Sequence, residues 1–504
     1  MKIFNTDQIR AIDRYTIDVE GVNALELIER VAEGVTCEII SRWRPNKRIA
    51  IFAGPGNNGA DALAVARMLI EQGYKPEIFL FNIGGNRLSA DCKASRDRLL
   101  ELGDIDYTEV KGNFTLPDLS RNHLVIDGLF GSGLKEPLSG GFMALVRYIN
   151  ESNATVVSID VPSGMFCDWN RGAINRNIIH ANLTLAVQFP RLGFFISDNA
   201  DLVGEWKVID IELSVDKIKE TPSDYYMVEK NDVRRVLQRR KSFSSKADYG
   251  SAMIIAGSYG MMGAAVLAAK GALRAGAGKV SVHSARCGYN ILQTSVPEAL
   301  YEADKHDIAV TNMLLQRQYS AIAIGPGIGT NELTINALEA FLKASSEPVV
   351  LDADALNCIA LRPTLLNHIP ILSIITPHAG EFDRLFGAQT NAESRLLKAV
   401  EVARYYNLII VLKGHHTATV RPDGKIYFNS TGNPAMATGG SGDVLTGIIV
   451  ALMAQGYKPE ISALLGAYIH GEAGDIAAEE HGQYGVTAGD IANNVGRAIK
   501  SIMI

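Results

Sequence analysis

Short apolar runs of strand length alternate with longer helical runs along most of this 504-residue chain. The strand-length runs lie at residues 49–52, 77–81, 124–126, 155–159, 183–187, 249–256, 279–283, 321–324, 349–351, 371–375 and 408–412. Helices fit between them, for example at 61–71 and 89–102. Because strands separated by helices pair in parallel, the alternation predicts α/β sheets with helices on both faces.

The alternation dissolves around residues 210–223, where lysine, glutamate, proline and serine replace it. A chain of this length exceeds one ordinary core. We therefore expect a first domain over 1–216, a linker over 217–225 and a second domain over 226–504. Residues 6–40, ahead of the first strand, have helical spacing of their apolar side chains. We expect that segment to be a packing or interface arm of a homo-oligomer.

Composition and charge argue against several classes of protein. Apolar residues make up 47% and charged residues 21% of the chain, as in globular proteins. The net charge of −6, with one short basic patch over 234–241, argues against nucleic acid as a partner, and we interpret the patch as a solvated helix face. Residues 1–14 lack the apolar core of a signal peptide, and we expect no membrane span. Five scattered cysteines predict a reduced, cytoplasmic chain.

The first strand runs into a glycine-rich loop, Gly54–Asp61. Its spacing satisfies the dinucleotide-binding pattern, so a redox cofactor site is one interpretation. However, the next strand ends in 81–84 without an acidic residue that could hold a ribose. The paired amides of Asn57 and Asn58, with Asp61, better suit a polar ligand or an ion.

Two further strand ends carry carboxylates. Asp127 precedes a glycine-rich turn, and Asp160 is followed by Ser163. Either aspartate alone could be a turn or cap residue. Since the carboxyl ends of parallel strands meet at one edge, we expect both to lie near Asn58. Such oxygen atoms suit a hard cation, and the carboxylates could also transfer protons.

In the second half, the stretch Gly432–Gly447 leads a glycine-dense loop directly into an apolar helix. The free amides of a first helical turn form an anion site, and glycines let a phosphate approach them. Asp443 lies in that turn. It could simply cap the helix, and the helix terminus favours its ionised, weakly basic form.

Other polar segments follow strands of the second half, at 325–330, 352–357, 376–381 and 413–417. Each has an ordinary alternative, since Lys413 could be a surface lysine and His415–His416 a turn pair. Collected at one sheet edge beside Asp443, they predict a nucleotide pocket that faces a second ligand.

These segments carry a family resemblance. The second half resembles the ribokinase-like superfamily, and within it the ADP/ATP-dependent NAD(P)H-hydrate dehydratases, through 325–330, 376–381, 413–417 and 439–447. The first half resembles NAD(P)H-hydrate epimerases through 57–61 and 158–164. Together they cover nearly the whole chain in the order of the bifunctional NAD(P)H-hydrate repair enzymes. The fold so implied is α/β, with an N-terminal Rossmann-like three-layer αβα domain followed by a ribokinase-like domain.

The resemblance also implies site residues. Asp443 would be the catalytic base of the dehydratase, and Asp160 the acid or base of the epimerase. A potassium ion would be held by Asn58, Asp127 and Ser163. The epimerase substrate would contact Asn57, Asn58, Gly59, Ala60, Asp61, Gly131, Ser132, Gly133, Leu134, Lys135, Glu136, Pro137 and Asp160. The dehydratase substrate would contact Ala264, Gly327, His378 and Asp443. The nucleotide would contact Lys413, Gly414, His415, His416, Thr417 and Gly442.

The implied reactions are epimerisation of the R and S hydrates of NADH and NADPH, then dehydration of the S form with ADP and Mg²⁺, giving NAD(P)H, AMP and phosphate. One departure is visible, because epimerases usually have glycine where this chain has Ala60 and Ala62. If position 60 needs a positive φ, alanine would strain it and reduce epimerase activity. Two alternatives stay open: a small-molecule kinase fused to a regulatory domain, and a first half that only binds or oligomerises.

Overall fold

The computed structural model describes residues 1–84 and 87–504, which form two compact units, each built on a largely parallel sheet. The first unit spans Lys2–Ser223, and the second holds Asp224–Ile504 together with Met1. The division falls within the segment expected to be a linker. The beginning of this expected linker is helical, because Ser214 caps a short helix, α7, over Val215–Glu220.

The first unit is a three-layer αβα structure. Its sheet runs in the order β4-β3-β2-β5-β6-β7-β8, and every neighbouring pair is parallel. The strands of this sheet are β2 (Arg48–Ala53), β3 (Pro76–Phe81), β4 (Tyr107–Val110), β5 (His123–Gly128), β6 (Thr155–Ile159), β7 (Leu183–Val187) and β8 (Glu205–Ile209). The short β1 (Lys2–Ile3) precedes them in the chain and is not part of this sheet. Its helices are α1 (Thr6–Asp18), α2 (Ala24–Arg42), α3 (Asn57–Glu71), α4 (Ala90–Leu100), α5 (Gly140–Glu151), α6 (Ala200–Val203) and α7.

Strand residues alternate between two buried faces. In β2, Ile49 and Ile51 join the core formed with α1–α4, whereas Ala50 and Phe52 join the core formed with α5. Both faces of the central strands are therefore covered, as the continuous apolar runs predicted.

Two details of the first unit differ from the sequence prediction. The helix expected over 6–40 is broken at residues 19–23, where Gly21 has φ +74° and Asn23 caps α2. The glycine loop is also shorter than expected, because α3 begins at Asn57 and takes in residues 57–61. The amides of that segment therefore lie in the first helical turn.

The second unit has a larger mixed sheet. From β9 its order is β9-β18-β17-β16-β15-β14-β13-β10-β11-β12, and β17 runs antiparallel to both of its neighbours. Its strands are β9 (Tyr225–Val228), β10 (Ser251–Ile255), β11 (Lys279–Ser284), β12 (Leu300–Ala303), β13 (Ala321–Ile324), β14 (Val350–Leu351), β15 (Ile374–Ile375), β16 (Ile409–Leu412), β17 (Ala418–Val420) and β18 (Ile426–Asn429).

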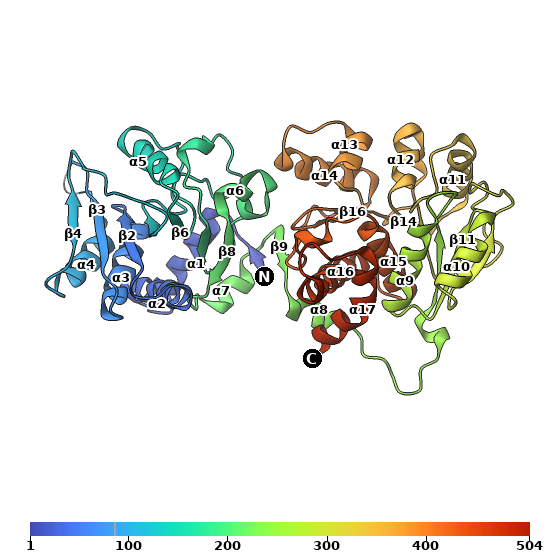
Figure 1. Ribbon diagram of the computed structural model, residues 1–504, viewed down its shortest axis with the longest axis horizontal. Coiled ribbons are helices and arrows are strands. Elements are labelled where there is room, and N and C mark those ends of the chain that lie inside the picture. Colours follow the sequence, from blue (N-terminus) through green and yellow to red (C-terminus); the bar gives the residue numbers. More distant parts are fainter. Residues whose placement is uncertain (85–86) are drawn as a thin grey trace. The chain divides into compact units, whose positions relative to one another are not determined.

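Helices cover both faces of this sheet. They are α8 (Lys230–Val236), α9 (Met262–Arg274), α10 (Tyr289–Ser295), α11 (Glu332–Ala344), α12 (Asp354–Leu361), α13 (Ala379–Phe386), α14 (Ala392–Tyr406), α15 (Ser441–Ala454), α16 (Pro459–His481) and α17 (Ala488–Met503). Figure 1 shows α11–α14 on one side of the sheet and α9, α15, α16 and α17 on the other. Small residues bring α9 and α15 close, since a Cβ at Gly447 would lie 2.0 Å from the Ala268 carbonyl oxygen.

Within the described ranges, no helix is both long and apolar enough to cross a membrane. The α/β class predicted from the sequence is confirmed in both units.

Candidate functional sites at two sheet edges

The carboxyl edge of the first sheet contains a buried carboxylate, Asp127, at the end of β5. It accepts hydrogen bonds from the hydroxyls of Ser158 (2.8 Å) and Ser163 (2.6 Å) and from the Ser163 amide (2.9 Å). Burial raises the pKa of Asp127, although these hydrogen bonds act in the opposite direction. Two of the three residues expected to hold a cation, Asp127 and Ser163, are therefore in direct contact.

Asn58, the third expected cation ligand, lies in the first turn of α3 and is buried. Its side-chain oxygen and nitrogen have no hydrogen-bond partner among the described residues. The loop after β5 passes beside it, because a Cβ at Gly131 would lie 3.4 Å from Asn58 Cβ and 3.1 Å from Asp160 Oδ2. An orphaned buried amide oxygen beside carboxylates is a fitting environment for a cation.

Asp160 is held in a constrained position just after β6. Its φ is +65°, a left-handed conformation that is unfavourable for most residues other than glycine. Its Oδ2 accepts a hydrogen bond from the Ser132 amide at 3.0 Å, and its Oδ1 accepts one from Arg191. The pKa of Asp61, in α3, is raised well above its usual value by burial and by the charges of neighbouring aspartates, Asp160 foremost.

A cavity of about 300 Å³ lies beside the loop expected to contact the epimerase substrate. Ser132, Leu134 and Lys135 line it, together with Thr6 and Asp7 of α1 and residues 166–171. Gly133 faces Arg10 of α1 instead, and Glu136 and Pro137 lie outside the lining.

The prediction of backbone strain at Ala60 is wrong. Ala60 and Ala62 lie inside α3, are fully buried and are absent from the residues with positive φ. Close packing instead favours small side chains here, since a Cβ at Gly128 would lie 2.4 Å from Ala62 Cβ. Gly59, by contrast, cannot accept a side chain, because a Cβ there would lie 1.8 Å from the Gly54 carbonyl oxygen.

At the carboxyl edge of the second sheet, Asp443 is the third residue of α15. Gly440 caps that helix with φ +90°, and a Cβ there would also lie 2.4 Å from Leu267 Cδ1. Burial, followed by the charge of Asp352, raises the pKa of Asp443 to about 7, although Lys413 acts in the opposite direction. Burial and like charge act in the opposite direction to the helix terminus, which was expected to favour the ionised, weakly basic form.

Lys413, at the end of β16, is fixed among acids. Its Nζ lies 2.9 Å from Asp352 Oδ1 and 3.7 Å from Glu381 Oε2. Burial works against its charge, but these two carboxylates outweigh burial and raise its pKa. The second oxygen of Asp352 accepts a hydrogen bond from Thr446 of α15 at 2.7 Å. These contacts exclude the alternative interpretation that Lys413 is a surface lysine.

Between Asp352 and Asp354, the backbone is strained. Ala353 has φ +48° and ψ −118°, a conformation that favours glycine. It separates two acids with different partners, since Asp354 Oδ2 accepts a hydrogen bond from the Gly329 amide at 2.9 Å. Gly327 in the same loop has φ +63°, and a Cβ there would lie 3.1 Å from Ala264 Cβ, so these two expected substrate contacts are neighbours.

A cavity of about 780 Å³ opens beside these residues. The expected nucleotide contacts Lys413, Gly414, His415, Thr417 and Gly442 all line it. So does His378, whose Nδ1 caps α13 by accepting hydrogen bonds from the Gly380 and Glu381 amides.

His416 is the exception among the expected nucleotide contacts. It lies outside the cavity lining, and its Nδ1 is 3.1 Å from the Asn429 carbonyl oxygen. Burial, and then the charge of His415, lower the pKa of His416 to about 4, so this ring is neutral.

The cavity also has walls that the sequence analysis missed. Its lining includes Asn433, Thr438 and His470. Asn433 donates to Asp475 Oδ1 at 2.8 Å, and His470 Nε2 lies 3.3 Å from the Ser441 hydroxyl. The Gly-Asn-Pro sequence at 432–434 was a signal for the first wall. His470 lies within the apolar helix α16, where its surroundings gave no sequence signal.

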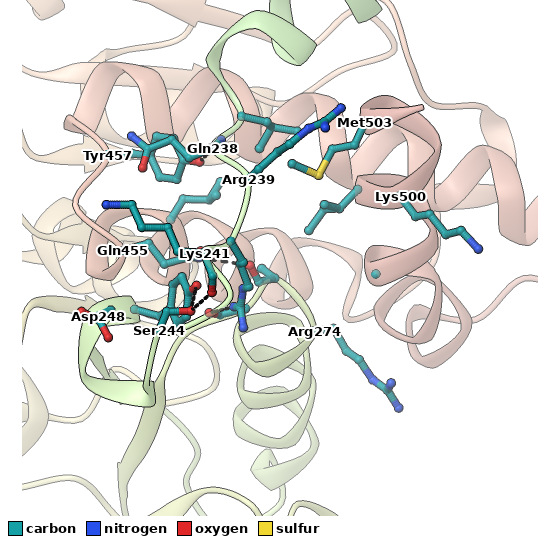
Figure 2. Close-up of a pocket in the computed structure, with 18 of the residues that line it drawn as sticks. Gln238, Arg239, Lys241, Ser244, Asp248, Arg274, Gln455, Tyr457, Lys500 and Met503 are labelled. Carbon is teal, nitrogen blue, oxygen red and sulfur yellow. Dashed lines mark hydrogen bonds between the residues drawn. The ribbon is translucent and has the colours of Figure 1, made fainter.

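The basic patch is a helix face only in part, because Arg234 and Arg235 are exposed on α8 but its other three basic residues lie beyond that helix. Since α8 ends at Val236, Arg239, Arg240 and Lys241 follow the helix and line a cavity of about 1180 Å³ that Figure 2 shows. Its other walls include Leu273, Arg274, Leu452 and Gln455, at the C-terminal ends of α9 and α15. Asp443 is at the N-terminal end of α15, so this cavity is separate from the acidic sheet edge.

Comparisons with known proteins find a family model for each half of the chain. Residues 252–497 match the NAD(P)H-hydrate dehydratase family model. Residues 24–193, a range that begins after α1, match the YjeF-related protein N-terminus model.

Relatives match along the whole chain. The bifunctional NAD(P)H-hydrate repair enzyme Nnr of Thermofilum pendens is 33% identical, over 100% of this chain and 97% of that protein. The Nnr of Moorella thermoacetica is 36% identical, over 94% of this chain and 89% of its own. A crystal structure of the ADP/ATP-dependent NAD(P)H-hydrate dehydratase of Bacillus subtilis, co-crystallised with ATP and Mg²⁺, covers 55% of this chain and 98% of its own with a TM-score of 0.50 and 34% identity.

Proposed function

The chain belongs to the family of bifunctional NAD(P)H-hydrate repair enzymes, and from that premise we propose how its residues divide the work. The enzyme is an isomerase and a lyase: it interconverts the R and S hydrates of NADH and NADPH and dehydrates the S form. A kinase fused to a non-catalytic domain is not favoured, because the relatives match along both halves. We assign epimerisation to the first unit and dehydration to the second.

The position of Asp443 carries the dehydratase assignment. It lies at the start of α15, next to the glycine-rich turn and close to the wall of the 780 Å³ cavity formed by Gly442 and Lys413. A carboxyl with a pKa of about 7 can accept a proton near neutral pH, which a carboxyl of ordinary pKa does poorly. We propose that Asp443 is the base.

The hydroxyl on C6 of the substrate ring is a poor leaving group until it is phosphorylated. Asp443 takes the hydroxyl proton while the hydroxyl oxygen attacks the terminal phosphorus of the nucleotide. The bond between that phosphorus and the bridging oxygen breaks, and the rest of the nucleotide leaves with the bond electrons. Phosphate then leaves with the C6–O bond electrons, and loss of a proton from the neighbouring ring carbon restores the dihydropyridine. The amides of Gly440–Gly442 face the transferred group, and each such donor contributes on the order of 3 kcal/mol to catalysis. We propose ADP as the donor.

Mg²⁺ fits this edge as an ion that arrives with the nucleotide. Among residues 1–84 and 87–504, no three acidic, histidine or cysteine side chains form a ready metal cage. Mg²⁺ commonly binds through phosphate oxygens and one or two carboxylates, which Asp352 and Asp354 would offer. The ion would neutralise the charge that builds on the phosphate oxygens.

In the first unit, we propose that Asn58, Asp127 and Ser163 hold a potassium ion. The unpaired amide of Asn58 and the raised pKa of buried Asp127 support this assignment, since a cation would satisfy the first and stabilise the ionised form of the second. Asp160 would transfer protons at the C6 oxygen, and the 131–137 loop would contact the substrate. We place the enzyme in the cytoplasm as a homo-oligomer that acts on small molecules.

The full-length protein, mixed with hydrated NADH and either ADP or ATP, tests the function. We expect recovery of reduced-nicotinamide absorbance with release of one orthophosphate per NADH, faster with ADP. With the pure R hydrate alone, we expect the S hydrate to form above the spontaneous rate. A stable phosphorylated product without NADH would instead identify a kinase.

A further inference from the structure

Arg191 is a buried guanidinium in the first unit, 3% exposed. Its Nη2 donates to Asp160 Oδ1 and, at 3.3 Å, to the Val187 carbonyl oxygen. Its Nε and Nη1 are also buried and have no hydrogen-bond partner within the described ranges. Unpaired donors on a buried charged group are destabilising, so they point to a functional requirement.

One face of α1 lies along the same site. Thr6, Arg10 and Asp13 are four and three residues apart, which places them on one side of the helix. Thr6 lines the 300 Å³ cavity, and a Cβ at Gly133 would lie 3.2 Å from the Arg10 guanidinium. Asp13, about one turn farther along α1, interacts electrostatically with Arg191 and Asp160. This face therefore contacts the substrate loop at Gly133 and interacts electrostatically with the carboxylate of Asp160.

Charged groups from several elements meet at this point. Asp13 comes from α1, Asp61 from α3, Asp160 from the end of β6, and Arg191 from the segment after β7. Burial raises the pKa of Asp13 to about 6, while Arg191 lowers it and Asp160 raises it. One guanidinium thus offsets the charge of carboxyls on both sides of the site.

We propose that α1 is a functional wall of the epimerase site, in which Asp13 and Arg191 are positioning residues for Asp160. Arg191 fixes Oδ1 of Asp160 while the Ser132 amide fixes Oδ2, so the carboxylate has one orientation toward the substrate. Asp13, three residues after Arg10 on the same face of α1, attracts the guanidinium electrostatically. Because Nε and Nη1 of Arg191 have no partner among the described residues, no third group competes with Asp160 and the Val187 carbonyl for the guanidinium. This inference rests on the proposed epimerase function.

The test measures both activities of the full-length chain, with dehydration as the control for enzyme concentration and the unfolding temperature of the first unit as the control for folding. We expect Arg191→Gln to lower epimerase kcat about 100-fold and Asp13→Asn about tenfold, with little change in KM. Arg191→Lys, which keeps the charge, should recover about tenfold of the loss in Arg191→Gln. The matched control is Asp18→Asn, at the exposed end of the same helix, which should leave both activities unchanged.

A double-mutant cycle completes the test, because coupled residues are not additive. Asp13→Asn should cost less in the Arg191→Gln background than in the wild type. Independent effects, or wild-type epimerase kcat in Asp13→Asn, would overturn the proposal. So would a fall in the unfolding temperature of the first unit that parallels the loss of epimerase activity, which would mark a structural role. Absence of epimerase activity in the wild type, with dehydration intact, would instead overturn the epimerase function itself.

Discussion

The two sheet edges hold their key carboxylates in opposite ways. In the first unit, Asp160 forms an ion pair with a buried arginine beside a cavity of about 300 Å³. In the second, Asp443 makes no ion pair within the described residues, and Asp352, Asp354 and Glu381 all act to raise its pKa. The cavity there measures about 780 Å³.

This difference shows how one architecture supports two kinds of chemistry. A carboxylate paired with a buried cation has a defined direction, which fixes where it can take or give a proton. A carboxyl surrounded by other acids and desolvated by burial is poised to gain or lose a proton near neutral pH. Parallel sheets deliver side chains to the same kind of edge, and the neighbours decide what the carboxyl does there.

The largest expected effect comes from removing the protonatable carboxyl. Asp443→Asn should lower the dehydratase rate about 10³-fold and leave epimerisation unchanged, because only the second edge loses its base. NADH recovery from the S hydrate measures the loss. Glu479→Gln, an exposed change on α16, is the control. Dehydration within twofold of the wild type in Asp443→Asn would exclude this residue as the base.

At the first edge, Asn58→Leu should lower epimerisation about 100-fold and abolish its dependence on potassium. The same change should not lower the unfolding temperature, because it removes an unpaired buried amide. Opposite directions for activity and stability would mark a site maintained for function. Potassium dependence that survives in the variant would contradict the assignment.

The glycine turn of the second edge offers a smaller, matched pair of changes. A Cβ at Gly442 would lie 3.3 Å from Lys413 Nζ, whereas a Cβ at Gly439 has nothing within 4 Å. Gly442→Ala should therefore raise the nucleotide KM about tenfold, and Gly439→Ala should not. An equal rise in the nucleotide KM in both variants would show that Lys413 does not restrict the side chain at position 442.

The pH dependence should separate the two edges. Because the pKa of Asp443 is about 7, the base is protonated below that pH, and kcat/KM for dehydration should fall about tenfold for each pH unit toward acid. Above pH 7 it should level off. The epimerase rate in the same buffers provides the comparison. A dehydratase profile that is flat from pH 5 to pH 7 would contradict the role of Asp443.

The smallest effect concerns stability alone. Ala60→Gly should reduce the stability of the first unit by about 1 kcal/mol, because glycine in a helix costs conformational entropy. Epimerase activity should not rise, since Ala60 is helical and unstrained. Thermal unfolding and the R-to-S assay measure both quantities. An increase in epimerase rate would restore the interpretation that alanine is strained there.

Several central strands were predictable from the sequence because burial on both faces leaves continuous apolar runs. Residues 155–159 and 183–187 were predicted with the bounds that β6 and β7 have. The edge strands β4 and β12 were missed, since they are short and only partly buried. Strand β8 was missed for the same reason, because exposed Glu205 and Lys207 interrupt its apolar residues.

The functional residues divide along a similar line. Asp443 and Lys413 lie in local motifs whose glycines and flanking apolar runs marked the strand ends. Arg191 gave no such signal, because its function depends on Asp160, 31 residues earlier in the chain. Asp13 is even farther from Asp160 along the chain. It lies in a segment that the spacing of apolar residues predicted only to be a packing or interface arm. Such residues acquire meaning from the tertiary structure alone.

Ala353 has a consequence for engineering this enzyme. Its backbone angles suit glycine, so Ala353→Gly would be an obvious choice for relieving strain in the folded state. Yet the alanine also narrows the conformations open to the chain between Asp352 and Asp354, which reach Lys413 and Gly329 in different directions. Stabilising this position would loosen the geometry of two acids at once, so a methyl group with no chemistry of its own maintains the precision of the catalytic edge.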